Sequence, residues 1–272
     1  GGASLFGGGV AIGRLLRLDS QRGDYRRSWE NHNLATLERL RQLDEHPEGE
    51  RPYLIVSLGD SSVQGMGASR VTESYPARLD SAITQQMDRE VLLLNLSLSG
   101  ATIESVELTQ LPQMRGLGLL DGPYRPDLVT LTIGGNDVMA EDMAPGQFEE
   151  RLRRILAALP SGALVSTIPS FGIMPQESRA QDMSDRIRAA VEDSDAHLVD
   201  LRSLTQEYSL PTYTFAYHAA DFFHPNSAAY AKWAQLFADA WAESRREPAP
   251  VVEDAPQWDM LSARVAQSEY DD

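Results

Sequence analysis

The chain of 272 residues contains no cysteine, and only one of its 24 basic residues is a lysine. The lack of cysteine excludes disulfide bonds, thiol nucleophiles and cysteine-ligated metals, and it leaves the cellular compartment open. Forty acidic residues outnumber the basic ones and give a net charge of −16. Such a balance argues against a surface that neutralises phosphates, so we expect no nucleic acid among the partners.

The sequence also lacks a run of about 20 apolar residues, which is the length that a membrane-spanning helix requires. Its most apolar stretch is Gly1–Leu16, and Arg14, Arg17 and Arg22 lie at the end of this stretch or just beyond it. Three interpretations fit: the trimmed end of a signal peptide or membrane anchor, a cloning remnant, or an irregular arm. We expect residues 1–24 to form an arm or anchor remnant, with export or membrane anchoring favoured over a cytoplasmic location.

Three further regions follow this arm. Residues 25–50 comprise an amphipathic helix over Tyr25–Glu45, with apolar residues at helical spacing from Trp29 onward, and a linker. Residues 51–246 form the main domain. Residues 247–272 hold seven acidic residues, three prolines and one arginine, which predicts a flexible acidic tail.

Within the main domain, short apolar runs alternate with longer segments of helical periodicity. Near-continuous apolar strands separated by helices indicate a parallel sheet with both faces covered. The prediction is an α/β fold, a three-layer α/β/α doubly wound domain around a mostly parallel five-stranded sheet. The predicted strands are Tyr53–Leu58, Val91–Leu96, Leu128–Ile133, Ala163–Ile168 and His197–Leu201. The predicted helices lie near Tyr75–Met87, Ile103–Met114, Gly146–Leu159, Ala180–Glu192 and Ser227–Ser244.

Polar and glycine-rich segments follow the first three strands, at the edge of the sheet where ligands bind in such folds. Ser61 comes directly after the first strand, in Gly-Asp-Ser, where a nucleophile is well presented. Gly100 follows the second strand and allows close approach of a backbone N–H to a developing oxyanion. Asn136 follows the third strand in Gly-Gly-Asn-Asp and offers a neutral amide donor. Each segment taken singly is also ordinary turn or helix-capping chemistry.

A fourth segment places Asp221 three residues before His224. A carboxylate at this spacing can orient an imidazole whose other nitrogen takes a proton from a serine hydroxyl. His218 is a rival base six residues earlier, without a carboxylate at comparable spacing. A structural Asp–His pair that caps the following helix is the alternative for the segment. We interpret Asp60 and Asp137 as carboxylates that stabilise turns through backbone N–H groups.

These four segments, in this order, resemble the blocks of the SGNH, or GDSL-type, hydrolase family over residues 53–243. One departure is Ser62, which stands where the family usually has leucine after Gly-Asp-Ser. The resemblance implies a flavodoxin-like fold, Ser61 as nucleophile, His224 as base and Asp221 as its orienting partner. It also implies an oxyanion hole made of the Ser61 N–H, the Gly100 N–H and the Asn136 side chain.

The implied activity is hydrolysis of a short- to medium-chain acyl ester through an acyl-serine, with no cofactor and no metal. The histidines have no recognisable ligand spacing, which agrees with that expectation. We expect a small-molecule, lipid or carbohydrate ester as substrate, and membrane or envelope association through the N-terminus. The alternatives are acyl transfer to a sugar or alcohol acceptor, and a catalytically silent glycan-binding module. Met139, Met143, Phe171 and Met174 are candidates for an acyl pocket or for ordinary packing.

Overall fold

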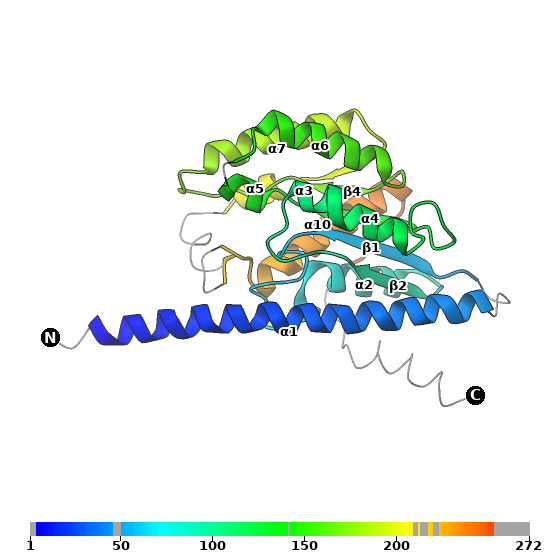
Figure 1. Ribbon diagram of the computed structural model, residues 1–272, viewed down its shortest axis with the longest axis horizontal. Helices are drawn as coiled ribbons and strands as arrows, with labels where there is room; N and C mark the ends of the chain where they lie inside the picture. Colours follow the sequence, from blue (N-terminus) through cyan, green and yellow to red (C-terminus); the bar gives the residue numbers. More distant parts are fainter. Residues whose placement is uncertain are drawn as a thin grey trace.

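The computed structural model describes residues 4–45, 50–140, 142–208, 212, 217–219 and 223–252. Its centre is a five-stranded sheet in the order β2-β1-β3-β4-β5, with layers of helices on either side (Figure 1). The predicted three-layer doubly wound fold is confirmed, and every strand pair is parallel rather than most of them. The strands are β1 (Tyr53–Gly59), β2 (Val91–Asn95), β3 (Leu128–Thr132), β4 (Leu164–Ser166) and β5 (His197–Val199).

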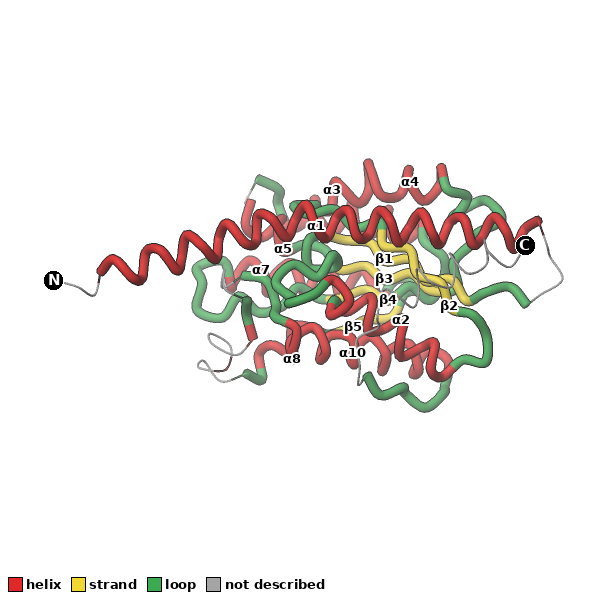
Figure 2. Tube along the Cα trace, turned by 90° about the horizontal axis from the view of Figure 1, so that it is seen from below, coloured by secondary structure: helices red, strands yellow, loops and turns green. Residues whose placement is uncertain are grey.

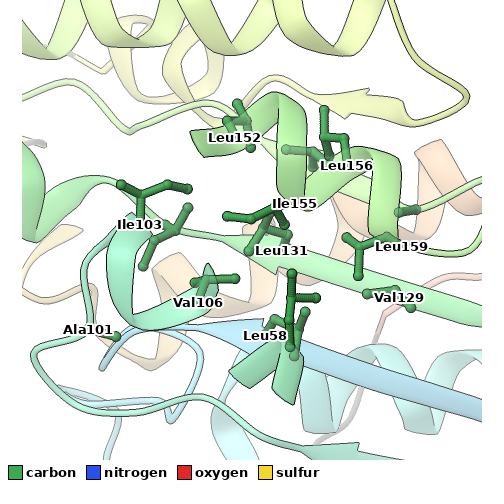
Figure 3. Close-up of a cluster of buried hydrophobic side chains, with 14 of the residues drawn as sticks. Leu58, Ala101, Ile103, Val106, Val129, Leu131, Leu152, Ile155, Leu156 and Leu159 are labelled. Carbon is green, nitrogen blue, oxygen red and sulfur yellow. The ribbon is translucent and has the colours of Figure 1, made fainter. Parts of the chain in front are cut away.

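Side chains alternate between the two faces of β1, so each face has its own core. Leu54, Val56 and Leu58 belong to one buried cluster, and Tyr53 and Ile55 belong to the other. Figure 3 shows Leu58 among apolar side chains from the neighbouring strand and the covering helices. The first face is covered by α3 (Ile103–Ser105), α4 (Leu111–Gly116), α6 (Pro145–Ala158) and α7 (Glu177–Glu192), and the second by α2 (Tyr75–Gln86) and α10 (Ser227–Arg245).

Three helical features differ from the sequence prediction. The segment predicted as one helix from Ile103 is interrupted by a π-helical turn, η2 (Val106–Gln110), between α3 and α4. A short helix, α8 (Leu201–Gln206), follows β5. Another, α5 (Gly135–Ala140), lies where Gly-Gly-Asn-Asp predicts a turn. Gly134, with φ of 114°, breaks the extended backbone after β3, and the residues beyond it have no strand to pair with and form a helical turn.

The N-terminal segment forms a single helix, α1 (Ser4–Glu45), which is longer than the predicted Tyr25–Glu45. Glycines lower helix propensity, but extending an existing helix requires no new nucleation, so residues before Tyr25 continue it. Along its later half α1 covers the open edge of β2. Asn33 exchanges two hydrogen bonds with the backbone of Asn95, and Thr36 Oγ1 donates to Leu93 O. Side chains of α1 thereby satisfy the groups that an edge strand otherwise exposes.

The first residues of the predicted acidic tail lie against the domain. Gln235 of α10 donates to Pro250 O and accepts from the Val252 backbone N–H, and Gln86 of α2 donates to Pro248 O. Residues 253–272, which hold most of the acidic residues of that prediction, lie outside the described part of the chain.

Candidate active site

Ser61 is presented by a tight backbone turn at the end of β1. Gly59 adopts φ of 141°, and a Cβ there would lie 2.0 Å from the backbone oxygen of Thr132 on β3. The Gln110 side chain, from the π-helical turn, accepts from Gly59 N at 2.9 Å and donates to Gly59 O at 2.8 Å. Gln110 therefore fixes both backbone polar groups of Gly59, and the turn directs Ser61 toward the loop before α10.

His224 faces that serine from the far end of the sequence. Its Nε2 lies 2.9 Å from Ser61 Oγ, across 163 residues of sequence. Two backbone hydrogen bonds, from Ala219 N to His224 O and from Asn226 N to Tyr217 O, pair the segments before and after the histidine. Asn226 also caps α10 by accepting from Ala229 N. The histidine is thus held between a paired backbone segment and a helix start.

Gly67 completes the contact between the serine loop and the histidine. With φ of 92°, a Cβ at this position would lie 2.5 Å from Pro225 O and 2.9 Å from His224 Cβ. Only glycine allows the two segments to approach this closely.

The structure separates the two histidines that sequence reasoning left in competition. His218 lines a cavity beside Ser61 and His224, and its ring packs edge-on against Tyr217 with 4.8 Å between ring centroids. His224, by contrast, bonds the serine. Asp221 lies outside the described residues, so its predicted role in orienting His224 stays a prediction.

Two of the predicted oxyanion donors, Asn136 and Gly100, lie in segments that contact each other. Asn136, in the first turn of α5, donates to Ala101 O at 2.8 Å, which ties it to the loop of Gly100. Gly100 has φ of 80°, a conformation that favours glycine. Within the described part of the chain, no hydrogen bond uses the backbone N–H of Ser61 or Gly100.

Two buried carboxyl groups lie behind this surface. Asp60 accepts from the backbone N–H and the hydroxyl of Ser62 at 2.8 Å each, and burial raises its pKa. Asp137 accepts from Ile103 N at 3.1 Å, and burial, together with the charge of Asp60, raises its pKa from 3.8 to about 6. The contact of Asp60 within its own turn has the form expected from the sequence, whereas Asp137 bonds the first residue of α3, 34 residues away.

The raised pKa of Asp137 predicts a loss of stability with increasing pH. Between about pH 4 and pH 6 the unfolded chain has released this proton while the folded chain retains it, so stability falls over that window. A shift from 3.8 to about 6 corresponds to about 3 kcal/mol in the free energy of unfolding. We expect Asp137→Asn to remove most of this fall, measured by urea denaturation at pH 4, 5, 6 and 7. Asp121→Asn, at an exposed ion pair, is the control that leaves the profile unchanged; equal profiles for Asp137→Asn and the unmodified protein contradict the prediction.

A cavity of about 70 Å³ opens beside Ser61 and His224. Phe171 and Phe223 meet edge to face on its apolar side, with ring centroids 6.2 Å apart, and Met174 also lines it. Phe171 and Met174 were sequence candidates for an acyl pocket, whereas Met139 and Met143 do not line this cavity.

The loop that carries Phe171 is anchored by groups that sequence reasoning missed. Glu177 accepts from Phe171 N at 2.5 Å and from Ser170 Oγ at 3.2 Å, and it pairs with the guanidinium of Arg202. Arg202 is 1% exposed and also donates to Gln181. Lone polar residues in helices have no sequence signature, so only their contacts identify this role.

Over the described residues, no group of three or more histidine, aspartate or glutamate side chains is arranged to hold a metal ion.

A sequence model of the GDSL-like Lipase/Acylhydrolase family matches residues 57–232. This span includes Ser61, Gly100, Asn136 and His224, and it excludes α1. A search of curated proteins by sequence found no match.

Solved structures share the fold at low sequence identity. A lipase/acylhydrolase from Enterococcus faecalis has a TM-score of 0.57 and 19% identity, over 71% of this chain and 96% of that one. An alpha/beta hydrolase enzyme from the metagenome of Lake Arreo, Spain, has a TM-score of 0.55 and 23% identity, over 71% and 97%. An acetylxylan esterase from Geobacillus stearothermophilus has a TM-score of 0.51 and 17% identity, over 70% and 94%.

Proposed function

Because the chain belongs to the GDSL-like lipase/acylhydrolase family, we propose that it is a serine esterase that hydrolyses short-chain acyl esters through an acyl-serine on Ser61. The observation that carries the proposal is the hydrogen bond of 2.9 Å between Ser61 Oγ and His224 Nε2. A serine within this distance of an imidazole nitrogen has the geometry of an activated nucleophile.

In the acylation step, His224 takes the proton of Ser61 Oγ, and the oxygen attacks the ester carbonyl. The carbonyl oxygen becomes negatively charged and is stabilised by the N–H groups of Ser61 and Gly100 and by the Asn136 amide. The C–O bond to the alcohol then breaks, and His224 returns the proton to the leaving oxygen. The acyl group remains on Ser61.

In the deacylation step, a water molecule takes the place of the alcohol. His224 removes its proton, the hydroxide attacks the acyl-serine, and the proton passes to Ser61 Oγ as the acid leaves. We assign Asp221 the role of keeping the imidazole in the tautomer that accepts at Nε2. The residues named supply every proton transfer, so the proposed cycle requires no cofactor.

The size of the cavity supports a short acyl chain. Its volume of about 70 Å³ is well below the roughly 300–1,000 Å³ of pockets that enclose drug-sized ligands. Phe171 is 7% exposed and is held through Glu177, so the apolar wall does not yield easily to a longer chain.

A series of p-nitrophenyl esters tests this proposal. We expect kcat/KM to be highest for the acetate or butyrate and at least ~10-fold lower for the octanoate, because each excess methylene meets a closed wall. Phe171→Ala opens that wall and shifts the preference toward octanoate. Ile173→Ala is the matched control, since Ile173 lies in the same loop but is 81% exposed. A peak at octanoate in the unmodified enzyme contradicts the short-chain assignment.

A further inference from the structure

The contacts of α1 show which way this helix runs past the domain. Near its C-terminal end it contacts the residue before β2, and toward its N-terminus it reaches the loop that follows Ser61. The contacts are Arg39–Glu90, Thr36–Leu93, Asn33–Asn95, Trp29–Gln64 and Tyr25–Ala68, in that order toward the N-terminus. The helix therefore passes from the beginning of β2 to its end and then past the catalytic edge of the sheet.

Residues 4–20 of α1 continue beyond that edge. Gln21, which donates to Ala68 O, is the first residue of the helix with a described contact to the domain. Seventeen further helical residues span about 26 Å at 1.5 Å per residue. Both Figure 1 and Figure 2 show this part of α1 projecting past the rest of the fold.

The composition of the projecting part differs from that of the remaining chain. Residues 4–20 hold two arginines, Arg14 and Arg17, and one acidic residue in a protein whose net charge is −16. The large apolar residues of this projecting part include Leu5, Phe6, Val10, Ile12, Leu15 and Leu16. Such a segment suits the surface of an anionic lipid bilayer, because its apolar side chains can contact the acyl chains and its arginines can contact the anionic headgroups. Within the described part of the chain, no helix has the length and apolar character needed to cross a membrane.

Two exposed apolar side chains lie on the same side of the molecule. Ile173, in the loop after β4, is 81% exposed, and Met139, on α5 after β3, is 40% exposed. Both follow the carboxyl ends of strands, at the edge that carries Ser61 and His224. The edge next to the projecting helix therefore offers apolar contacts of its own.

We propose that residues 4–20 of α1 bind the surface of an anionic lipid membrane and hold the catalytic edge of the sheet toward it. Tyr25 and Trp29 transmit this orientation, because they hydrogen-bond Ala68 and Gln64 in the loop that follows the serine. The consequence for the substrate rests on the proposed esterase function: esters at a membrane surface are hydrolysed in preference to esters dissolved in water.

Vesicle flotation of the full chain tests the membrane contact. We expect recovery with vesicles of phosphatidylcholine and phosphatidylglycerol, weaker recovery with phosphatidylcholine alone, and a decrease at high salt. Ile12→Glu/Leu16→Glu is expected to lower binding at least ~10-fold, because it places charges in the apolar segment. The matched control is Leu34→Glu/Leu108→Glu, at exposed positions in the later half of α1 and in η2, and we expect it to keep binding. The midpoint of urea denaturation, followed by circular dichroism, reports an intact fold for each variant independently of lipid and of activity.

The absence of cysteine permits a direct test of orientation with one introduced label. Ile173→Cys places an environment-sensitive fluorophore at the catalytic edge, and Asp121→Cys places one in the loop before β3, at the opposite edge. We expect vesicles to shift the emission to the blue only for the label at residue 173. An equal shift at both positions, or a shift at residue 121 alone, overturns the orientation.

The same experiments distinguish a second copy of this chain as the occupant. Equal flotation of the Ile12→Glu/Leu16→Glu variant and the unmodified protein overturns the membrane proposal. A dimer in light scattering that the Ile12→Glu/Leu16→Glu variant abolishes, without lipid binding by the unmodified protein, also overturns it. Because neither readout is activity, failure of the esterase assignment leaves this test intact.

Discussion

Ser61→Ala is expected to lower kcat for p-nitrophenyl acetate by at least ~10⁴-fold. In the proposed mechanism, the hydroxyl that lies 2.9 Å from His224 Nε2 is the group that becomes acylated, and alanine cannot form that bond. We expect the residual rate to come from the proposed oxyanion donors, Gly100 and Asn136, which would still stabilise attack by water. Stopped-flow kinetics measure the rate, and mass spectrometry of the quenched enzyme measures the acyl adduct, which disappears in this variant.

Ser62→Ala is the matched control for that experiment. Its hydroxyl donates to Asp60, away from the imidazole, so we expect activity within about tenfold of the unmodified enzyme. His224→Ala behaves like Ser61→Ala, whereas His218→Ala keeps most of the activity. Retention of a tenth or more of the activity in Ser61→Ala would falsify the assignment of the nucleophile.

Gly59→Ala is expected to lower the free energy of unfolding by at least about 4 kcal/mol, because backbone strain and overpacking act together. The new Cβ meets the Thr132 backbone oxygen at 2.0 Å and Val63 Cγ2 at 2.6 Å. Gly59 and Thr132 are register partners in the β1–β3 pair, so relief requires the centre of the sheet to separate. Urea denaturation followed by circular dichroism measures the loss. If the variant accumulates only as insoluble protein, the loss of stability is large enough to prevent folding.

The control for this substitution is Gly162→Ala. Gly162 also has a positive φ, of 81°, but a Cβ there meets nothing within 4 Å. Backbone strain alone predicts a loss of about 1 kcal/mol. Similar losses of unfolding free energy at the two positions would contradict the prediction, because they would mean that the contact of the new Cβ with β3 does not destabilise the Gly59→Ala variant.

The position of the candidate site was predictable because strand order hardly affects it. Ser61, Gly100 and Asn136 each follow a buried strand, and the carboxyl ends of parallel strands meet at one edge whatever the order of the strands. The boundaries of β1 and α10 were likewise close to prediction, since their apolar periodicity is strong. The short helix that carries Asn136 was not predicted, because Gly-Gly-Asn-Asp is equally good turn chemistry.

The supports of the site were not predictable. Gln110 holds both backbone groups of Gly59 across 51 residues, and Arg202 pairs with Glu177 across 25. Nothing in the neighbouring sequence distinguishes these side chains from other polar residues in helices. Their function depends on distances that arise only when separate elements pack together.

The sequence by itself determined the layered α/β fold, the family, and the candidate residues for a nucleophile, a base and oxyanion donors. Periodicity and short motifs are local properties, so they can be recognised without knowing how the rest of the chain folds. Only the tertiary structure decided that His224 rather than His218 bonds Ser61, that Phe171 lines a small cavity beside this pair, and that α1 runs past the edge of the sheet that carries Ser61. Each of these depends on packing between elements distant in sequence, which local patterns do not encode.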